Sequence, residues 1–271
     1  MEAPRHNAQT AVRFLGTATV TPGPGADTAC VLLDRATLVD TGWNAAVNML
    51  QYGCDPLDVD WLFITHCHHD HYIGLPQLLF YHGMKQRERP GKDPLTIVGP
   101  KPDLQLVVDR ALAFLRGDQF PNVAKRPEVV PLQAGDRIET THFTVETAPT
   151  IHPVVGLCYR FHSRRSGADV VITGDTARHL PLADHAEGAD LLVHEASRGP
   201  VASSPNDRGG HAGAEDAADI AKTANVRRLA LIHYPAQRRQ ETLRAAQSIF
   251  PNTCAPREGD TILLPEALNN P

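Results

Sequence analysis

A short run of metal-binding side chains after an apolar stretch constrains this chain more than any other feature. Residues 61–64 (Trp-Leu-Phe-Ile) have the composition of a buried strand, and Thr-His-Cys-His-His-Asp-His follows at 65–71. His66 and His68 are two positions apart, so both imidazoles point to the same side of an extended chain. Neutral imidazole and carboxylate are the ligands that zinc and similar ions prefer. The run therefore predicts a metal site at the end of a strand; a polar loop that happens to be rich in histidine is the alternative.

Length and charge limit the other classes of protein. The 271 residues contain no linker, repeat or low-complexity segment, so we expect a single domain over residues 1–271. Hydrophobic residues make up 42% of the chain, which is enough for a large core. The net charge of −5 argues against a protein that mainly binds the phosphates of nucleic acids. We expect a small-molecule substrate and no stable nucleic-acid partner.

The cysteines and the apolar segments bear on the compartment. Five cysteines without a Cys-x-x-Cys pair indicate reduced thiols rather than a disulfide framework. The start of the chain has no signal-peptide core, and no later run approaches the roughly 20 apolar residues of a membrane span. We expect a cytoplasmic protein without a membrane partner. Cys67 lies inside the metal-binding run; we favour a packed thiol there, and a role at the metal stays open.

Apolar periodicity predicts an α/β protein. Strands are expected over residues 12–15, 30–33, 36–39, 61–64, 95–98, 129–130, 137–138, 143–145, 157–161, 168–172, 191–195 and 229–232. Helices are expected over residues 44–51, 72–82, 102–115 and 214–224.

Together with the run at 65–71, the stretch from about residue 14 to residue 264 resembles the metallo-β-lactamase-fold hydrolases. Within them it is most similar to the ribonuclease Z-type phosphodiesterases. The resemblance implies a four-layer αββα sandwich, with two mixed sheets, outer helices and a metal site at one edge between the sheets. Composition and spacing alone predict only an α/β protein that binds metal.

The resemblance also implies a dinuclear site with zinc as the expected metal, although manganese and iron tolerate the same ligands. Such ions share a hydroxide and clamp the oxygens of the reacting group. Asp175 and His233 each follow a predicted apolar strand, and His152 lies between two strands. The implied ligands are His66, His68 and His152 for the first ion, Asp70, His71 and His233 for the second, and Asp175 between both. Asp70 also counts among the catalytic residues.

Three more residues receive roles from the resemblance. Asp40, at the end of a predicted strand, would orient a ligand histidine; alternatively it caps the helix predicted over 44–51. Glu195 ends the strand Leu-Leu-Val-His-Glu, and His211 follows two glycines before an alanine-rich helix. In the resembled group this pair protonates the leaving oxygen, with the histidine as general acid. Ala212-Gly213 stands where that group has Ser-Thr, and a surface histidine at a helix start is the alternative.

The size of the substrate is inferred from the absence of an inserted segment. Ribonuclease Z proteins that hold precursor tRNA insert a long arm between the third ligand and the bridging aspartate. Here a predicted hairpin fills residues 153–174, so the arm is absent. We therefore expect a phosphodiesterase for small or cyclic phosphodiesters, with tRNA 3′ processing less favoured. The alternatives are a carbonyl hydrolase for lactones, thioesters or β-lactams, an arylsulfatase, and a metal-containing scaffold without turnover. Relatives of this type often form homodimers, and the sequence leaves the oligomeric state open.

Overall fold

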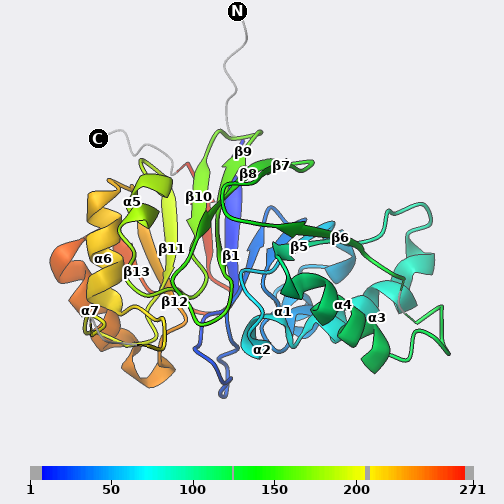
Figure 1. Ribbon diagram of the computed structural model, residues 1–271. Helices are drawn as coiled ribbons and strands as arrows, with labels where there is room; N and C mark the ends of the chain where they lie inside the picture. Colours follow the sequence, from blue (N-terminus) through cyan, green and yellow to red (C-terminus); the bar gives the residue numbers. More distant parts are fainter. Residues whose placement is uncertain (1–7, 124, 205–207, 266–271) are drawn as a thin grey trace, which may run out of the picture.

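The computed structural model describes residues 8–123, 125–204 and 208–265. Two seven-stranded mixed sheets face each other, and helices lie on their outer sides (Figure 1). The predicted αββα class is therefore confirmed. Residues 1–7, where the sequence predicts no signal peptide, lie outside the described residues.

The first sheet is antiparallel on one side and parallel on the other. Strands from β14 to β3 pair antiparallel, and those from β3 to β6 pair parallel. In spatial order the strands are β14 (Thr261–Leu264), β1 (Thr10–Gly16), β2 (Cys30–Leu33), β3 (Thr37–Val39), β4 (Trp61–Phe63), β5 (Thr96–Pro100) and β6 (Glu128–Leu132).

The second sheet has the same mixed character. Its strands from β13 to β10 pair parallel, and those from β10 to β7 pair antiparallel. In spatial order they are β13 (Thr253–Cys254), β12 (Leu229–Ile232), β11 (Leu191–Glu195), β10 (Asp169–Ile172), β9 (Leu157–Ser163), β8 (Phe143–Pro149) and β7 (Arg137–Glu139). Strands β9 and β10 form the hairpin that the sequence predicts between the third ligand and Asp175.

Helices cover the two sheets in two groups. Those beside the first sheet are α1 (Ala45–Gln51), α2 (His69–Tyr72), α3 (Leu75–Lys85) and α4 (Asp103–Phe114), with the 3₁₀ turns η1 (Pro56–Asp58) and η2 (Gln86–Glu88). Those beside the second are α5 (Pro181–His185), α6 (Ala214–Thr223) and α7 (Arg239–Ile249), with η3 (Ala236–Arg238). Among the described residues, none of these helices has the length and apolar character needed to cross a bilayer.

Neighbouring strand residues supply different layers of the core. Because successive side chains of a strand point to opposite faces, Phe63 faces the space between the sheets while Leu62 packs under α3 and α4. The Phe63 ring meets Tyr159 of the opposite sheet edge-on, with ring centroids 5.2 Å apart and planes at 75°. Val170 and Val171 divide in the same way between the centre and the α5–α7 layer. Burial on both faces explains why these strands are continuous apolar runs.

The helix predicted over 72–82 is interrupted. Helix α2 ends at Tyr72 and α3 begins at Leu75, with Pro76 in the first turn of α3. Proline has no N–H to donate to the carbonyl four residues earlier, so a continuous helix through this position is disfavoured. Gly74 lies at the break, and a Cβ there would come within 2.9 Å of the carbonyl oxygen of Gly42. The break therefore separates α2, which carries the last residues of the run at 65–71, from α3.

Candidate metal centre

The ends of several strands converge on one edge between the two sheets. His66 follows β4, Asp175 follows β10, and His233 follows β12 directly. His152 lies in the loop between β8 and β9, and this loop is joined to the metal-binding run by a β-bridge between His66 and Gly156. Residues far apart in sequence therefore meet here, as the carboxyl ends of neighbouring parallel strands do.

Three histidines form the first group. His66, His68 and His152 each offer a ring nitrogen, and these atoms lie within 4.8 Å of one another. The Nδ1 atom of His68 is 2.8 Å from the Nε2 atom of His152. Burial and the nearby His71 lower the pKa of His66 well below its ordinary value, so this imidazole is neutral and keeps a lone pair for a cation.

Four buried residues form the second group. Asp70, His71, Asp175 and His233 offer ligand atoms within 4.8 Å of one another. The Oδ2 atom of Asp70 lies 3.4 Å from Nε2 of His71 and 3.1 Å from Nε2 of His233. Burial opposes ionisation of Asp175, but the imidazoles of His233 and His71 outweigh it and hold the pKa of Asp175 well below its ordinary value. The group therefore presents two carboxylates and two imidazoles.

Asp175 lies between the two groups. Its Oδ2 atom is 3.5 Å from Nε2 of His71 and 3.8 Å from Nε2 of His66, which belong to different groups. A carboxylate in this position can contact two cations at once. The structure thus brings together all seven residues that the resemblance implies as ligands, in the two groups that it implies.

Unsatisfied buried atoms test whether these residues fit a metal. Among the described residues, Nε2 of His66, Nε2 of His71 and Oδ1 of Asp175 are buried and have no hydrogen-bond partner. Such atoms are costly unless a ligand satisfies them. Burial lowers the pKa of His71, but Asp175 and Asp40 raise it well above its ordinary value, which shows that the carboxylates demand positive charge here. Divalent ions would meet both requirements, so the residues fit the predicted metals.

Neighbouring groups orient the histidine rings. The Nδ1–H of His71 donates to Oδ2 of Asp40 at 2.7 Å, and the Nδ1–H of His152 donates to the carbonyl of Gly210 at 2.8 Å. In both rings this leaves Nε2 for a metal, because the partner of one nitrogen decides which nitrogen keeps the proton. Thr65 also donates to Asp40, from its backbone N–H and its hydroxyl, both at 2.8 Å.

Asp40 therefore lies beside His71, a predicted ligand, and among the described hydrogen bonds it makes none to the start of the following helix. The backbone N–H groups of Trp43 and Asn44, at the start of α1, donate to the carboxylate of Asp27 at 3.1 and 2.8 Å. The side chain of Asn48 donates to the same carboxylate at 2.9 Å. Asp27, which the sequence analysis did not single out, thus holds the segment directly before α1, and the N-cap residue Asn44 makes no side-chain capping hydrogen bond.

The partly exposed His211 pairs with the buried Glu195 beside the second group. The Nδ1–H of His211 donates to Oε1 of Glu195 at 2.9 Å, and Glu195 also accepts the N–H groups of Thr176 and Ser197. Burial lowers the pKa of His211, but the hydrogen bond and charge of Glu195, with a contribution from Asp175, raise it above its ordinary value. The arrangement favours a protonated imidazole, which is the form that a general acid requires.

The loop before His211 packs closely against His152 of the first group. Gly210 has φ of +64°, and a Cβ at this position would lie 2.8 Å from the Cα of His152. A residue with a side chain could not approach in this way.

Cys67 does not point to the candidate metal centre. It packs against the apolar cluster between the first sheet and its covering helices, and burial raises the pKa of its thiol to about 12. Among the described residues it belongs to none of the potential metal groups.

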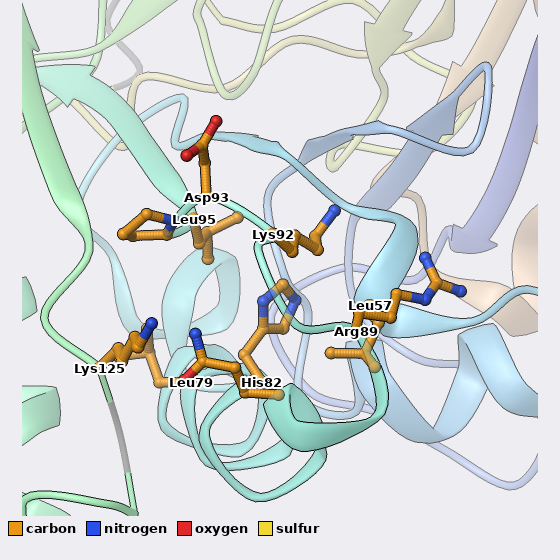
Figure 2. A pocket seen from close by; sticks show the side chains of 10 residues that line it. Leu57, Leu79, His82, Arg89, Lys92, Asp93, Leu95 and Lys125 are labelled. Atoms are coloured by element: carbon orange, nitrogen blue, oxygen red, sulfur yellow. The ribbon is translucent and has the colours of Figure 1, made fainter.

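A separate cavity of about 30 Å³ lies beside α3 and the start of β5. Figure 2 shows Leu79, His82 and Leu95 around it, with the charged ends of Arg89 and Lys92 directed away from its centre. Arg89 pairs with Asp55 and Asp58, and Lys92 pairs with Asp60. Because these two cations already have carboxylate partners, they give no reason to place an anionic substrate here.

Sequence reasoning missed the residues that orient the ligands, apart from Asp40. Thr65 directly precedes the first ligand, and Ser197 follows Glu195 by two positions. Hydroxyl groups next to proposed site residues were the available signal, but nothing local indicates which ring each hydroxyl reaches.

Comparison with known proteins gives a consistent result. The sequence profile described as the metallo-beta-lactamase superfamily matches residues 23–233, more than half of the chain. A ribonuclease Z of Methanothermobacter thermautotrophicus is 26% identical over 295 residues, with 89% of this chain and 92% of the relative covered. A ribonuclease Z of Natronomonas pharaonis is 30% identical over 313 residues, with 94% and 97% covered. The crystal structure of the metallo-beta-lactamase fold protein YhfI from Bacillus subtilis superimposes with a TM-score of 0.79 at 22% identity, covering 94% and 100% of the two chains.

Proposed function

The chain belongs to the metallo-beta-lactamase superfamily of metal-dependent hydrolases, and from this premise we propose that it is a dinuclear zinc phosphodiesterase acting on small or cyclic phosphodiesters. The observation that carries the proposal is the Glu195–His211 pair beside the second metal group. Hydrolysis of a phosphodiester releases an alkoxide, which is a poor leaving group unless it is protonated. A protonated imidazole such as that of His211 would supply that proton.

The proposed ligands would hold two ions, with His66, His68 and His152 on one, Asp70, His71 and His233 on the other, and Asp175 on both. Such a pair supplies an activated water and positive charge for the phosphoryl oxygens. The chain's own residues do the rest. The carboxylate of Asp70 lies beside His71 and His233 and would offset the positive charge of the second ion. His211 holds a proton on Nδ1 for Glu195 and donates the proton of Nε2 to the leaving oxygen as the P–O bond breaks. The imidazole is then neutral until it regains a proton from water.

The size of the substrate is inferred from the short hairpin. Strands β9 and β10 pair directly, with Asp169 opposite His162, so only residues 164–168 connect them. The alignment with the Natronomonas relative extends over 313 positions, more than the 271 residues of this chain, so that relative carries segments this chain lacks. A net charge of −5 adds no attraction for a polyanion. These observations support a small phosphodiester.

Processing of tRNA is the second candidate, because the relatives named ribonuclease Z cover nearly the whole chain. It uses the same metals and the same acid, so the site does not separate the two. The two candidates differ in the length of the substrate. A lactone, thioester or β-lactam hydrolase, or an arylsulfatase, would use the metals without needing His211 for a good leaving group.

The test compares leaving groups. Zinc-loaded wild type and His211→Ala are assayed with bis(p-nitrophenyl) phosphate, with a 2′,3′-cyclic nucleotide and with a precursor tRNA. p-Nitrophenolate leaves readily without protonation, whereas a ribose alkoxide does not. The loss caused by His211→Ala should therefore reach on the order of 10²–10⁴-fold with the cyclic nucleotide and be much smaller with the nitrophenyl ester. His162→Ala, which removes an exposed histidine paired with Asp169, is the matched control.

Each contrary result has a definite meaning. An equal loss with both leaving groups would show that His211 is not a general acid. Efficient cleavage of precursor tRNA with no turnover of the cyclic nucleotide would favour the second candidate. A protein that binds two metals but hydrolyses none of the three would contradict the phosphodiesterase proposal and direct attention to carbonyl and sulfate esters.

A further inference from the structure

Ser197 connects the two functional parts of the site through different atoms. Its backbone N–H donates to Oε2 of Glu195 at 3.0 Å. Its hydroxyl oxygen lies 2.7 Å from Nδ1 of His233 and 3.2 Å from the carbonyl oxygen of the same residue. Main chain and side chain thus serve different neighbours, the acid pair and a proposed metal ligand. A substitution of the side chain alone separates these two roles.

The backbone of His233 is in an unusual conformation. Its φ is +52°, in the left-handed region that residues with a side chain seldom occupy. Such a conformation costs free energy and persists only where surrounding contacts hold it. The hydroxyl of Ser197, bonded to the ring and to the carbonyl of this one residue, is such a contact. His233 directly follows β12, so the turn of its backbone decides where the imidazole points.

The hydrogen bonds also decide which nitrogen of His233 can bind a metal. Nδ1 faces the Ser197 hydroxyl and lies 3.3 Å from Oδ1 of Asp175, an atom that accepts no hydrogen bond from the described residues. Nε2 faces Oδ2 of Asp70 at 3.1 Å. With the hydroxyl donating to the His233 carbonyl, its oxygen accepts from Nδ1–H. The proton is then fixed on Nδ1, and the lone pair of Nε2 is directed into the second group.

We propose that Ser197 is a positioning residue for the second metal, because its hydroxyl sets both the tautomer and the orientation of His233. In this role the hydroxyl of Ser197 acts through His233, to which both of its described hydrogen bonds go. The inference rests on the dinuclear site of the proposed function, but not on the substrate class. The first group, His66, His68 and His152, makes no contact with the Ser197 hydroxyl among the described hydrogen bonds. Loss of the hydroxyl should therefore affect one ion and spare the other.

The experiment measures metal binding. Wild type, Ser197→Ala and Ser197→Thr are loaded with zinc, and zinc transfer to a chromophoric chelator is followed at increasing chelator concentration. Wild type should release two ions per chain. Ser197→Ala should release one ion as wild type does and bind the other 10–100-fold more weakly, the usual effect of losing a group that orients a ligand. Ser197→Thr keeps a hydroxyl and should restore most of the difference. His233→Ala marks the curve expected when the second site loses a ligand.

Two controls separate positioning from general damage. Ser248→Ala removes an exposed hydroxyl on α7 whose one described hydrogen bond goes to the carbonyl of Ala245, and its release curve should match wild type. The pH profile of any measurable activity should keep its basic limb in Ser197→Ala, because the backbone bond to Glu195 remains.

Two outcomes would overturn the inference. One is a Ser197→Ala protein that releases both ions as wild type does. The other is a parallel weakening of both ions with a lowered melting temperature, which would indicate a structural role only. A wild-type protein that binds two ions but hydrolyses no phosphodiester would contradict the proposed function and leave this test intact.

Discussion

The Oδ2 atom of Asp40 lies 2.7 Å from Nδ1 of His71, and both residues are buried. Asp40 follows β3 with φ of +55°, and His71 lies in α2, so the contact joins a strained strand end to the metal-binding run. The carboxylate accepts the imidazole N–H and thereby keeps Nε2 of His71 available for a cation. Through this contact Asp40 would influence metal binding without touching the ion.

Replacing Asp40 by Asn should weaken zinc binding about 10–100-fold, because the amide removes the charge that holds the His71 ring. Chelator competition measures the change, and Asp93→Asn on the surface is the matched control. An unchanged affinity in Asp40→Asn would show that the ring is held by packing alone.

Replacing Glu195 by Gln should move the basic limb of the pH–rate profile to lower pH. Glu195 raises the pKa of His211, and a general acid loses activity as pH rises through its pKa. Without the carboxylate charge that pKa falls, so the loss begins at lower pH. The profile is recorded with the cyclic nucleotide, and Glu146→Gln on the exposed face of β8 should leave it in place. A limb that does not move would exclude His211 as its source.

Removal of the metals should destabilise the fold. The two groups bring carboxylates and imidazole nitrogens close together in a buried site, and an ion that binds only the folded chain stabilises it by about 2.7 kcal/mol at 100 times its dissociation constant. We expect a chelator to lower the melting temperature and excess zinc to restore it. An identical melting temperature with and without chelator, in protein shown to have lost its zinc, would contradict this expectation.

Gly213→Ala should displace the segment that carries His211. A Cβ at this position would lie 1.6 Å from the carbonyl oxygen of Val201, so the backbone must move. Overpacking of this kind costs about 1–3 kcal/mol, which denaturant unfolding measures. Gly23→Ala is the control, since a Cβ there meets nothing within 4 Å. Equal stabilities of the two variants would show that the loop adapts freely.

His194 should make the protein less stable in mild acid. Its side chain is fully buried, and burial lowers its pKa, although the carbonyl and charge of Glu195 partly oppose this. The folded chain therefore binds fewer protons at this residue than the unfolded chain does, and stability falls as pH drops below the unfolded pKa of about 6.5, by about 1.4 kcal/mol at one unit below.

In His194→Asn the amide can still donate to the carbonyl of Glu195, as Nδ1 does at 2.8 Å, but it cannot titrate. The difference in unfolding free energy between pH 8 and pH 5.5 should shrink by a similar amount. His162→Asn, on the exposed part of β9, should leave that difference unchanged. An equally steep dependence in His194→Asn would assign it to other histidines.

The sequence alone determined the centre of the candidate metal site and the α/β class of the fold. The run at 65–71 follows a strand of apolar residues, and both features are local, so spacing and composition reveal them. The resemblance extended this to His152, Asp175 and His233, and the structure brings these residues together. The resemblance likewise singled out Asp40 as an orienting residue, and the structure places it beside His71.

Only the tertiary structure decided which groups hold the ligands in place and how the local elements end. Ser197 reaches His233 across 36 residues, and Asp70 reaches the same ring across 163. The Asp27 carboxylate accepts the N–H groups directly before α1 from another loop, and α7 and β14 had no predicted counterpart. A hydrogen bond depends on the meeting of two atoms in space. For Ser197 and His233 that meeting is set by the parallel pairing of β11 and β12, and for Asp70 and His233 by the packing of the two sheets. Local patterns specify which residues can bind; the packing specifies which of them meet.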